Sequence, residues 1–357
     1  MRNKSLLWIL LGTICLLGSV SCQKEMFGRR IRFKARTHLE ALLTKTIYSG
    51  DISEANSKTY ERIDWEDGDE VLLAMTNETQ TTPATQAYQI TDITASGRDS
   101  KAGLEPASPS INGLEWGTGT HDFWAAYPST ATAGDHTFSF PIPSAQRVSY
   151  LGKKNDVLRF APDMSNAFMV AGLQSDPTNS GINLDFSPGF TTFEFTVGGN
   201  DNLTIASFEM ETEAYETETS TIVPVCGTAV ATFDTSDNMS YTFSTADSPA
   251  PGQKVTVTFD NGSGSDYHPE ISTTTSLNFK VFALPRNLTG IVIRFRLVNG
   301  DTHSLKLKQN DSWLSFQAGV KYNISGLLIP GAVWYITYGY PREEQWITHP
   351  DIEIGVE

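Results

Sequence analysis

Motifs for catalysis and for cofactor binding are missing from this sequence. Its six histidines are scattered and form no H-E-x-x-H pair. There is no phosphate-binding loop, no dinucleotide fingerprint and no G-x-S-x-G elbow. These absences exclude the best-known sequence classes of metalloprotease, nucleotide-binding enzyme and serine hydrolase. We therefore expect neither an enzyme nor a bound cofactor or metal.

Basic residues are few compared with acidic ones. The chain has 26 Lys and Arg against 41 Asp and Glu, so its formal net charge is −15. A surface with this charge repels phosphate backbones, and nucleic acid is excluded as a partner. Hydrophobic residues make up 39% of the 357 residues, which is enough for buried cores. The sequence thus indicates a folded, acidic protein that does not bind nucleic acid.

The first 22 residues predict an export signal that ends at a cysteine. A basic start precedes an apolar run from Leu6 to Leu17, which is too short to span a bilayer comfortably. Ser19-Val20-Ser21-Cys22 resembles a bacterial lipobox, where the signal is cut before a cysteine that then carries lipid. We expect residues 1–21 to be a lipoprotein signal peptide and Cys22 to anchor the chain in an outer membrane. The alternative is a plain signal peptide that ends near an unrelated cysteine.

Cysteine is too scarce for a disulfide framework. Of the three cysteines, Cys15 leaves with the predicted signal and Cys22 carries the lipid. Only Cys226 then remains, so no disulfide forms within the mature chain. Because Cys226 lies in the apolar stretch IVPVCGTAV, far from any histidine, we expect a small buried hydrophobic residue rather than a reactive thiol.

Alternation of apolar and polar residues recurs along the whole chain. It is clear in EVLLAM (70–75), FEFTV (193–197), KVTVTFD (254–260) and IVIRFRL (291–297), with turn-forming clusters between such segments. Short strands at this spacing predict an all-β protein of antiparallel sandwiches. The glycines of VGGNDN (197–202) suggest a boundary. We expect an N-terminal domain over 22–199, a C-terminal domain over 200–340, and an extension with a final strand over 341–357.

Two local clusters allow both a binding and a structural interpretation. DWEDGDE (64–70) suggests a calcium site, but it does not fit the EF-hand spacing. We favour a tight turn at Asp67-Gly68. Trp116, Trp124 and Tyr127 are candidates for a ligand-stacking platform that would bind glycans. The alternative, which we favour, is that these rings fill a core.

The order of motifs along the chain is similar to that of a known family. After the lipobox come IRFKAR (31–36), TKTIYSG (44–50), RIDWEDGDEVLL (62–73) and DFWAAYP (122–128). LDFSPGFTTFEFTV (184–197), LTIASFEM (203–210), FKVFALP (279–285), LTGIVIRFRL (288–297) and QAGVKYNISGLL (317–328) follow. Together these segments resemble the fimbrillin-like proteins of bacteroidal bacteria over nearly the whole mature chain. The resemblance implies two tandem transthyretin-like Greek-key β-sandwich domains, and a role as subunit, tip or anchor of type V pili.

The resemblance also implies a way of assembly. In polymerising members, an arginine-specific protease removes the first strand, and a strand from a neighbouring subunit fills the groove. The matching site here is after Arg36, and the displaced strand would present Ile31, Phe33 and Ala35. The alternative is that the basic residues of this stretch only protect a sheet edge. Other fimbrial subunits, the membrane, and host or bacterial surface ligands are the partners to expect.

The last seven residues, DIEIGVE (351–357), form a candidate donor strand. Ile352, Ile354 and Val356 alternate with polar residues and glycine, which is typical of a half-buried strand. Buried in a neighbour's groove, these three side chains would contribute roughly 5–9 kcal/mol before ordering costs. The alternative is that the segment closes its own C-terminal domain. The two functions to compare are therefore a fimbrial structural or adhesive component and a surface glycan-binding lipoprotein.

Overall fold

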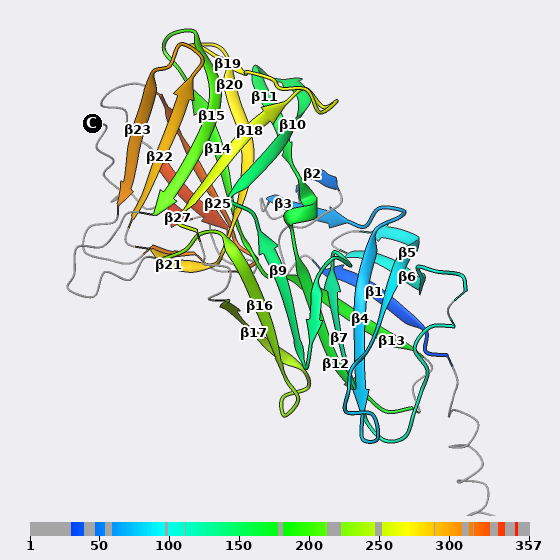
Figure 1. Cartoon of the computed structure of the whole chain (residues 1–357). Helices are drawn as coiled ribbons and strands as arrows, with labels where there is room; N and C mark the ends of the chain where they lie inside the picture. Colours follow the sequence, from blue (N-terminus) through cyan, green and yellow to red (C-terminus); the bar gives the residue numbers. More distant parts are fainter. Residues whose placement is uncertain are drawn as a thin grey trace, which may run out of the picture.

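The computed structural model is built almost entirely from β-strands (Figure 1). It describes residues 30–38, 47–53, 59–96, 99–110, 112–177, 181–212, 223–246, 252–288, 290–308, 314–316, 318–328, 335–339 and 347–348. Within these ranges the only helical element is η1 (Met164–Asn166), a single 3₁₀ turn. None of the described helical structure has the length and hydropathy of a membrane span. The predicted all-β class is confirmed.

Seven strands form a closed barrel near the N-terminal end of the chain. In spatial order they are β1 (Phe33–His38), β13 (Ile182–Pro188), β12 (Met169–Ser175), β7 (His121–Tyr127), β4 (Glu70–Asn77), β5 (Ala84–Ser96) and β6 (Asp99–Pro106). The inward residues of each strand form a core of their own, which includes Val71, Leu73, Tyr88, Phe123 and Leu184. Closure leaves no free sheet edge in this unit.

The barrel forms one lobe of the molecule, and a second sheet, of twelve strands, forms the other lobe (Figure 1). Its path runs through β23 (Thr302–Lys308), β22 (Gly290–Leu297), β15 (Leu203–Thr212), β18 (Lys254–Asp260), β10 (Ala145–Lys154), β11 (Val157–Pro162), β20 (Ser276–Ala283), β14 (Thr191–Gly198), β25 (Lys321–Leu327), β26 (Tyr335–Gly339) and β27 (Ile347–Thr348), with β19 (Glu270–Ile271) on β15. Phe195 of β14 lies 4.6 Å from Phe208 of β15, measured between ring centroids. Because these strands are far apart along the path, the sheet folds over its own core.

A four-stranded sheet connects the two lobes. It consists of β17 (Ser240–Thr245), β16 (Gly227–Asp234), β9 (Thr137–Ile142) and β8 (Thr132–Gly134). Its apolar face covers the outside of the barrel, where Phe140 stacks on Phe168 at 4.3 Å. Gly172 of β12 allows close approach, since a Cβ there would lie 2.3 Å from the Met239 carbonyl oxygen. The pairs β2 (Ile47–Ser53) with β3 (Thr59–Asp64) and β21 (Arg286–Leu288) with β24 (Leu314–Phe316) complete the fold.

The strand pairing differs from the predicted division into two tandem domains. β10, β11 and β14 precede residue 200, yet they pair with β18, β20 and β25, which follow it. The glycines at 198 and 199 therefore mark a turn within the twelve-stranded sheet, not a boundary between domains. Among the described strands, four pairs, including β1 with β13, are parallel rather than antiparallel. A glycine-rich turn can reverse the chain within a sheet or between two domains, so the glycine content of the turn does not distinguish the two.

Candidate functional site

Strand β1 lies between two other strands of the barrel. It pairs in parallel with β13, where Phe33 is opposite Ile182 and Ala35 is opposite Leu184. It pairs antiparallel with β6, where the same two residues are opposite Leu104 and Ala102. Removal of β1 would therefore leave two unpaired strand edges that face each other across a gap.

The apolar face of the first strand points into the barrel core. Ile31, Phe33 and Ala35 are 1%, 2% and 1% exposed, as their alternation predicts. The Phe33 ring packs edge-on against Tyr88 at 5.3 Å and against Phe123 at 5.6 Å. A strand that replaced β1 would need apolar side chains at these alternate positions to fill the same space.

The outer face of the first strand is basic and joins both neighbouring strands. Arg30 forms an ion pair with Glu105 of β6 at 2.6 Å. The Arg36 guanidinium donates two hydrogen bonds to the Asp185 carboxylate of β13, at 2.7 and 2.9 Å. Both pairs are exposed to solvent, and exposed pairs contribute at most about 1 kcal/mol each. Burial of the apolar face, rather than these ion pairs, holds the strand in place.

The position of Arg36 sets a condition for cleavage. The peptide bond after Arg36 lies within β1, which is paired with β13 up to Thr37 and with β6 up to His38. A protease binds its substrate as an extended, unpaired segment, so this part of β1 must open before it is cut. Cleavage after Arg36 stays a prediction, and it requires local release of the strand first.

A loop over residues 112–120 holds the segment that leads into β1. The Ile31 N–H donates to the Leu114 carbonyl at 2.9 Å, and Arg30 forms a bridge with Glu115. The buried His121 ring organises this loop, because its Nε2 accepts from the Gly117 N–H at 2.9 Å and its Nδ1 lies 2.9 Å from the Gly119 carbonyl oxygen. A neutral imidazole is needed for the first of these bonds.

This loop is expected to weaken in mild acid. Burial lowers the pKa of His121 below 6.5, although the Gly119 carbonyl and the nearby Asp122, Asp176 and Glu78 act in the opposite direction. A base whose pKa is lowered by folding stabilises the fold fully above its unfolded pKa and loses that contribution as the pH falls. Between about pH 7 and 5, the free energy of unfolding should fall more steeply for the native chain than for His121→Asn. Equal slopes in urea titrations would contradict this role.

The aromatic residues proposed as a glycan platform are buried instead. Trp116, Trp124 and Tyr127 are 3%, 0% and 3% exposed. Trp116 packs on His121 and Phe123, Trp124 stacks on His136, and the Tyr127 hydroxyl donates to Asp69. Trp116 and Tyr127 belong to the barrel core, and Trp124 belongs to the core between the barrel and the four-stranded sheet. The stacking interpretation is therefore not supported. Large rings on an alternating strand are buried more often than exposed, because they contribute the most apolar area.

The acidic segment at 64–70 forms the predicted turn. Gly68 has a φ of +91°, Trp65 is buried, and the Glu66 N–H donates to the Asp69 carboxylate at 2.9 Å. In the part of the chain that the structure describes, no group of three or more His, Cys, Asp or Glu residues is arranged to hold a metal ion. Cys226 is also buried and free, as expected, and its thiol donates to the Lys254 carbonyl oxygen.

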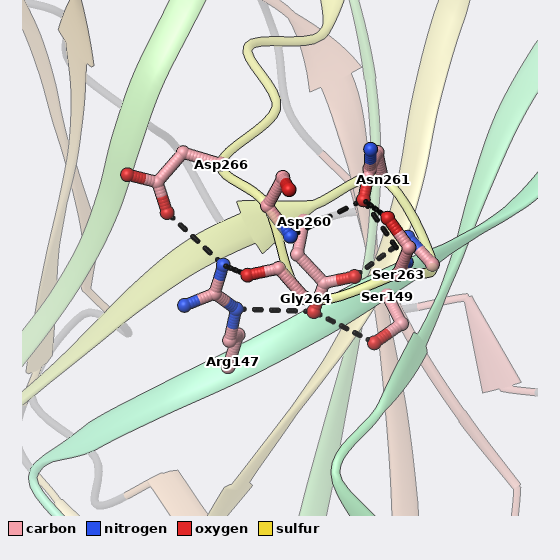
Figure 2. Close-up of polar contacts among 9 residues, drawn as sticks. Arg147, Ser149, Asp260, Asn261, Ser263, Gly264 and Asp266 are labelled. Carbon is pink, nitrogen blue, oxygen red and sulfur yellow. Dashed lines mark hydrogen bonds and ion pairs between the residues drawn. The ribbon is translucent and has the colours of Figure 1, made fainter.

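A dense polar cluster joins β10 to the loop that follows β18 in the twelve-stranded sheet (Figure 2). Arg147 of β10 donates to Asp260 at 3.1 Å, to Asp266 at 3.0 Å and to the Gly264 carbonyl at 2.7 Å. The buried Asp260 carboxylate also accepts from Ser149 at 2.8 Å. These groups satisfy one another, so the cluster closes the loop over 260–266 and offers no reactive group.

The residues that surround the first strand are not indicated by any sequence pattern. Ala102, Leu104, Ile182 and Leu184 line the position of β1, and Asp185 binds Arg36. The alternation in INLDFSP (182–188) predicts a strand, but it does not indicate which strand lies beside it. Cys22 and the candidate donor residues Ile352, Ile354 and Val356 lie outside the described residues.

Comparison with known proteins identifies one family. The family model described as fimbrillin-like matches residues 55–328. A candidate cell adhesion protein from Bacteroides uniformis is 14% identical, covering 88% of this chain and 99% of its own, with a TM-score of 0.49. One from Bacteroides ovatus is 12% identical over 90% and 99%, with a TM-score of 0.48. A fimbrial assembly protein from Parabacteroides distasonis is 7% identical over 89% and 98%, at 0.39. No curated protein matches the chain.

Proposed function

Because the chain belongs to the fimbrillin-like family, we propose that it is a structural or adhesive component of cell-surface fimbriae that assembles by β-strand exchange. In this proposal, lipid on Cys22 holds the exported chain at the outer membrane. Removal of the first strand then prepares it for assembly with other fimbrial subunits. The fimbrial or adhesive role agrees with the family. The anchor, the cleavage and the exchange are the specific parts of the proposal.

The placement of β1 is the observation that supports strand exchange. A single short strand closes the barrel, and its release would free the edges of β6 and β13 together with the space filled by Phe33. Unpaired edges beside an apolar groove bind an extended strand through main-chain hydrogen bonds and alternate side chains. The basic outer face of β1, with Arg36 near its end, offers an arginine-specific protease its recognition residue.

The segment 351–357 is the proposed donor. Its three apolar residues alternate, as do Ile31, Phe33 and Ala35, so its pattern suits the space that β1 leaves. Pairing of 351–357 within its own domain is the competing possibility. For an adhesive role, surface ligands of host or bacterial origin are the further partners that we propose. Glycan binding through Trp116, Trp124 and Tyr127 is not proposed, because these rings are buried.

Protease treatment tests the proposed assembly. After digestion with an arginine-specific protease, we expect mass spectrometry to find Thr37 as the first residue and light scattering to show multimers. Arg36→Gln should stay uncut at this bond and monomeric. Deletion of 351–357 should permit the cut but abolish multimers, with an unchanged melting temperature.

Two results would refute strand exchange. One is a cut chain that remains monomeric. The other is multimer formation that does not depend on 351–357. The anchor is tested separately on protein taken from cells, because an acyl mass on Cys22 at the N-terminus demonstrates lipidation.

A further inference from the structure

Sheet edges outside the barrel differ in how they are protected against pairing with other chains. Proteins protect edges with short strands, with charged residues or with bulges. In the described part of the chain, β8, β19, β21, β24 and β27 have three residues or fewer. β23 contains Lys306 and Lys308, β3 contains charged residues, and β2 contains Asp51 and a register shift. Each of these edges has a recognisable protection.

Strand β17 has none of these protections. Its sequence, SYTFST (240–245), has six residues, no charge and no proline. Thr and aromatic residues favour extended structure, and an uncharged segment of this kind readily pairs with another strand. Ser240, Thr242 and Ser244 are exposed, whereas Tyr241 and Phe243 are half-buried against the molecule. Figure 1 shows β17 at the outer margin of the four-stranded sheet.

The free backbone groups of β17 can be assigned from the register. Ala246 donates its N–H to the Thr228 carbonyl, so residues 242 and 244 point their backbone groups toward β16. The alternate residues Tyr241, Phe243 and Thr245 then point theirs away from the sheet. No described residue bonds to these backbone groups. They form a row of free donors and acceptors along an uncharged edge.

We propose that β17 is an interaction edge that pairs antiparallel with β17 of a second copy of the chain. Phe243 would lie opposite Phe243 of the second copy, and Tyr241 opposite Thr245. This register uses all three outward-pointing residues of each strand and joins the two four-stranded sheets into one. The edge is distinct from the β1 position, because β17 belongs to the sheet that covers the outside of the barrel.

The charge distribution favours a second copy as the occupant. When SYTFST pairs antiparallel with itself, no charged residues lie opposite each other. A charged partner strand, in contrast, would have no oppositely charged residue at this edge with which to form an ion pair. Each chain has a formal net charge of −15, so two copies repel each other at long range. Salt screens this repulsion. Association through β17 should therefore strengthen as salt is added, whereas association driven by opposite charges would weaken.

Sedimentation velocity of the native chain, isolated from cell membranes in detergent with its first strand in place, tests the proposal. We expect a monomer–dimer equilibrium that shifts toward dimer with protein and salt concentration. Thr242→Lys combined with Ser244→Lys brings like charges opposite each other in the pair. It should weaken the dimer at least about tenfold. The matched control, Thr232→Lys combined with Thr228→Lys, adds the same charges on β16, one strand from the edge, and should have a much smaller effect.

Other outcomes overturn the proposal. A chain that stays monomeric up to about 1 mM has no such interface. A dimer that both double variants weaken equally, or that deletion of 351–357 abolishes, uses another surface. Unchanged melting temperatures of the variants would show that the fold is intact. Because this test uses uncut chain, its failure is distinguishable from a failure of strand exchange.

Discussion

Phe33→Ala is expected to lower the free energy of unfolding by about 3–5 kcal/mol. The Phe33 side chain is 2% exposed, and its ring contacts Tyr88 and Phe123 in the middle of the barrel. Truncation removes this buried area and leaves a cavity that the closed barrel cannot easily collapse to fill. Urea unfolding monitored by circular dichroism measures the loss. Lys34→Ala, an exposed neighbour on the same strand, should change stability by less than about 0.5 kcal/mol.

The same substitution should accelerate cleavage after Arg36. If β1 opens locally before it is cut, a loss of 3 kcal/mol in its packing raises the opened population by about two powers of ten. The initial rate of cleavage by an arginine-specific protease should rise by a similar factor in Phe33→Ala and remain unchanged in Lys34→Ala. Equal rates in the native chain and Phe33→Ala would show that cleavage does not depend on release of β1.

Glu194→Gln is expected to destabilise the twelve-stranded sheet by about 3–5 kcal/mol. The Glu194 carboxylate on β14 lies 2.7 Å from the Lys321 ammonium and 3.9 Å from that of Lys280, and both lysines are largely buried. Asn278 donates a further hydrogen bond to it at 3.0 Å. The substitution keeps the shape but removes the negative charge between two buried positive charges. Glu211→Gln, which affects a more exposed pair with Arg294, should cost at most about 1 kcal/mol.

The pH dependence of stability provides an independent check on Glu194. Burial alone raises the pKa of its carboxyl group, but Lys280, Lys321 and the hydrogen bonds from Lys321 and Asn278 more than offset this and lower the pKa from 4.5 to about 2. An acid with a lowered pKa stabilises the fold fully above its unfolded pKa and loses that contribution as the pH falls toward its folded pKa. The difference in stability between the native chain and Glu194→Gln should therefore shrink between pH 4.5 and about 2. A constant difference would contradict this assignment.

The sequence patterns predicted burial more reliably than they predicted neighbours. Ile31, Phe33 and Ala35 are buried as their alternation indicated, and Asp67-Gly68 forms a turn. The alternative of an exposed platform at Trp116, Trp124 and Tyr127 was wrong, because hydrophobic rings gain most from complete burial. The division at 199/200 did not match the strand pairing, since β14 bonds to strands that come later in the chain.

The sequence by itself determined the all-β class and which face of a strand is apolar, whereas the export signal at residues 1–21 stays a prediction. These features depend on local composition and on a period of two residues. Only the tertiary structure decided that β1 lies between β6 and β13, that Arg36 meets Asp185, and that β17 is an uncharged edge. The physical reason is that strand pairing joins residues distant in sequence, and alternation specifies a buried face without specifying the strand beside it.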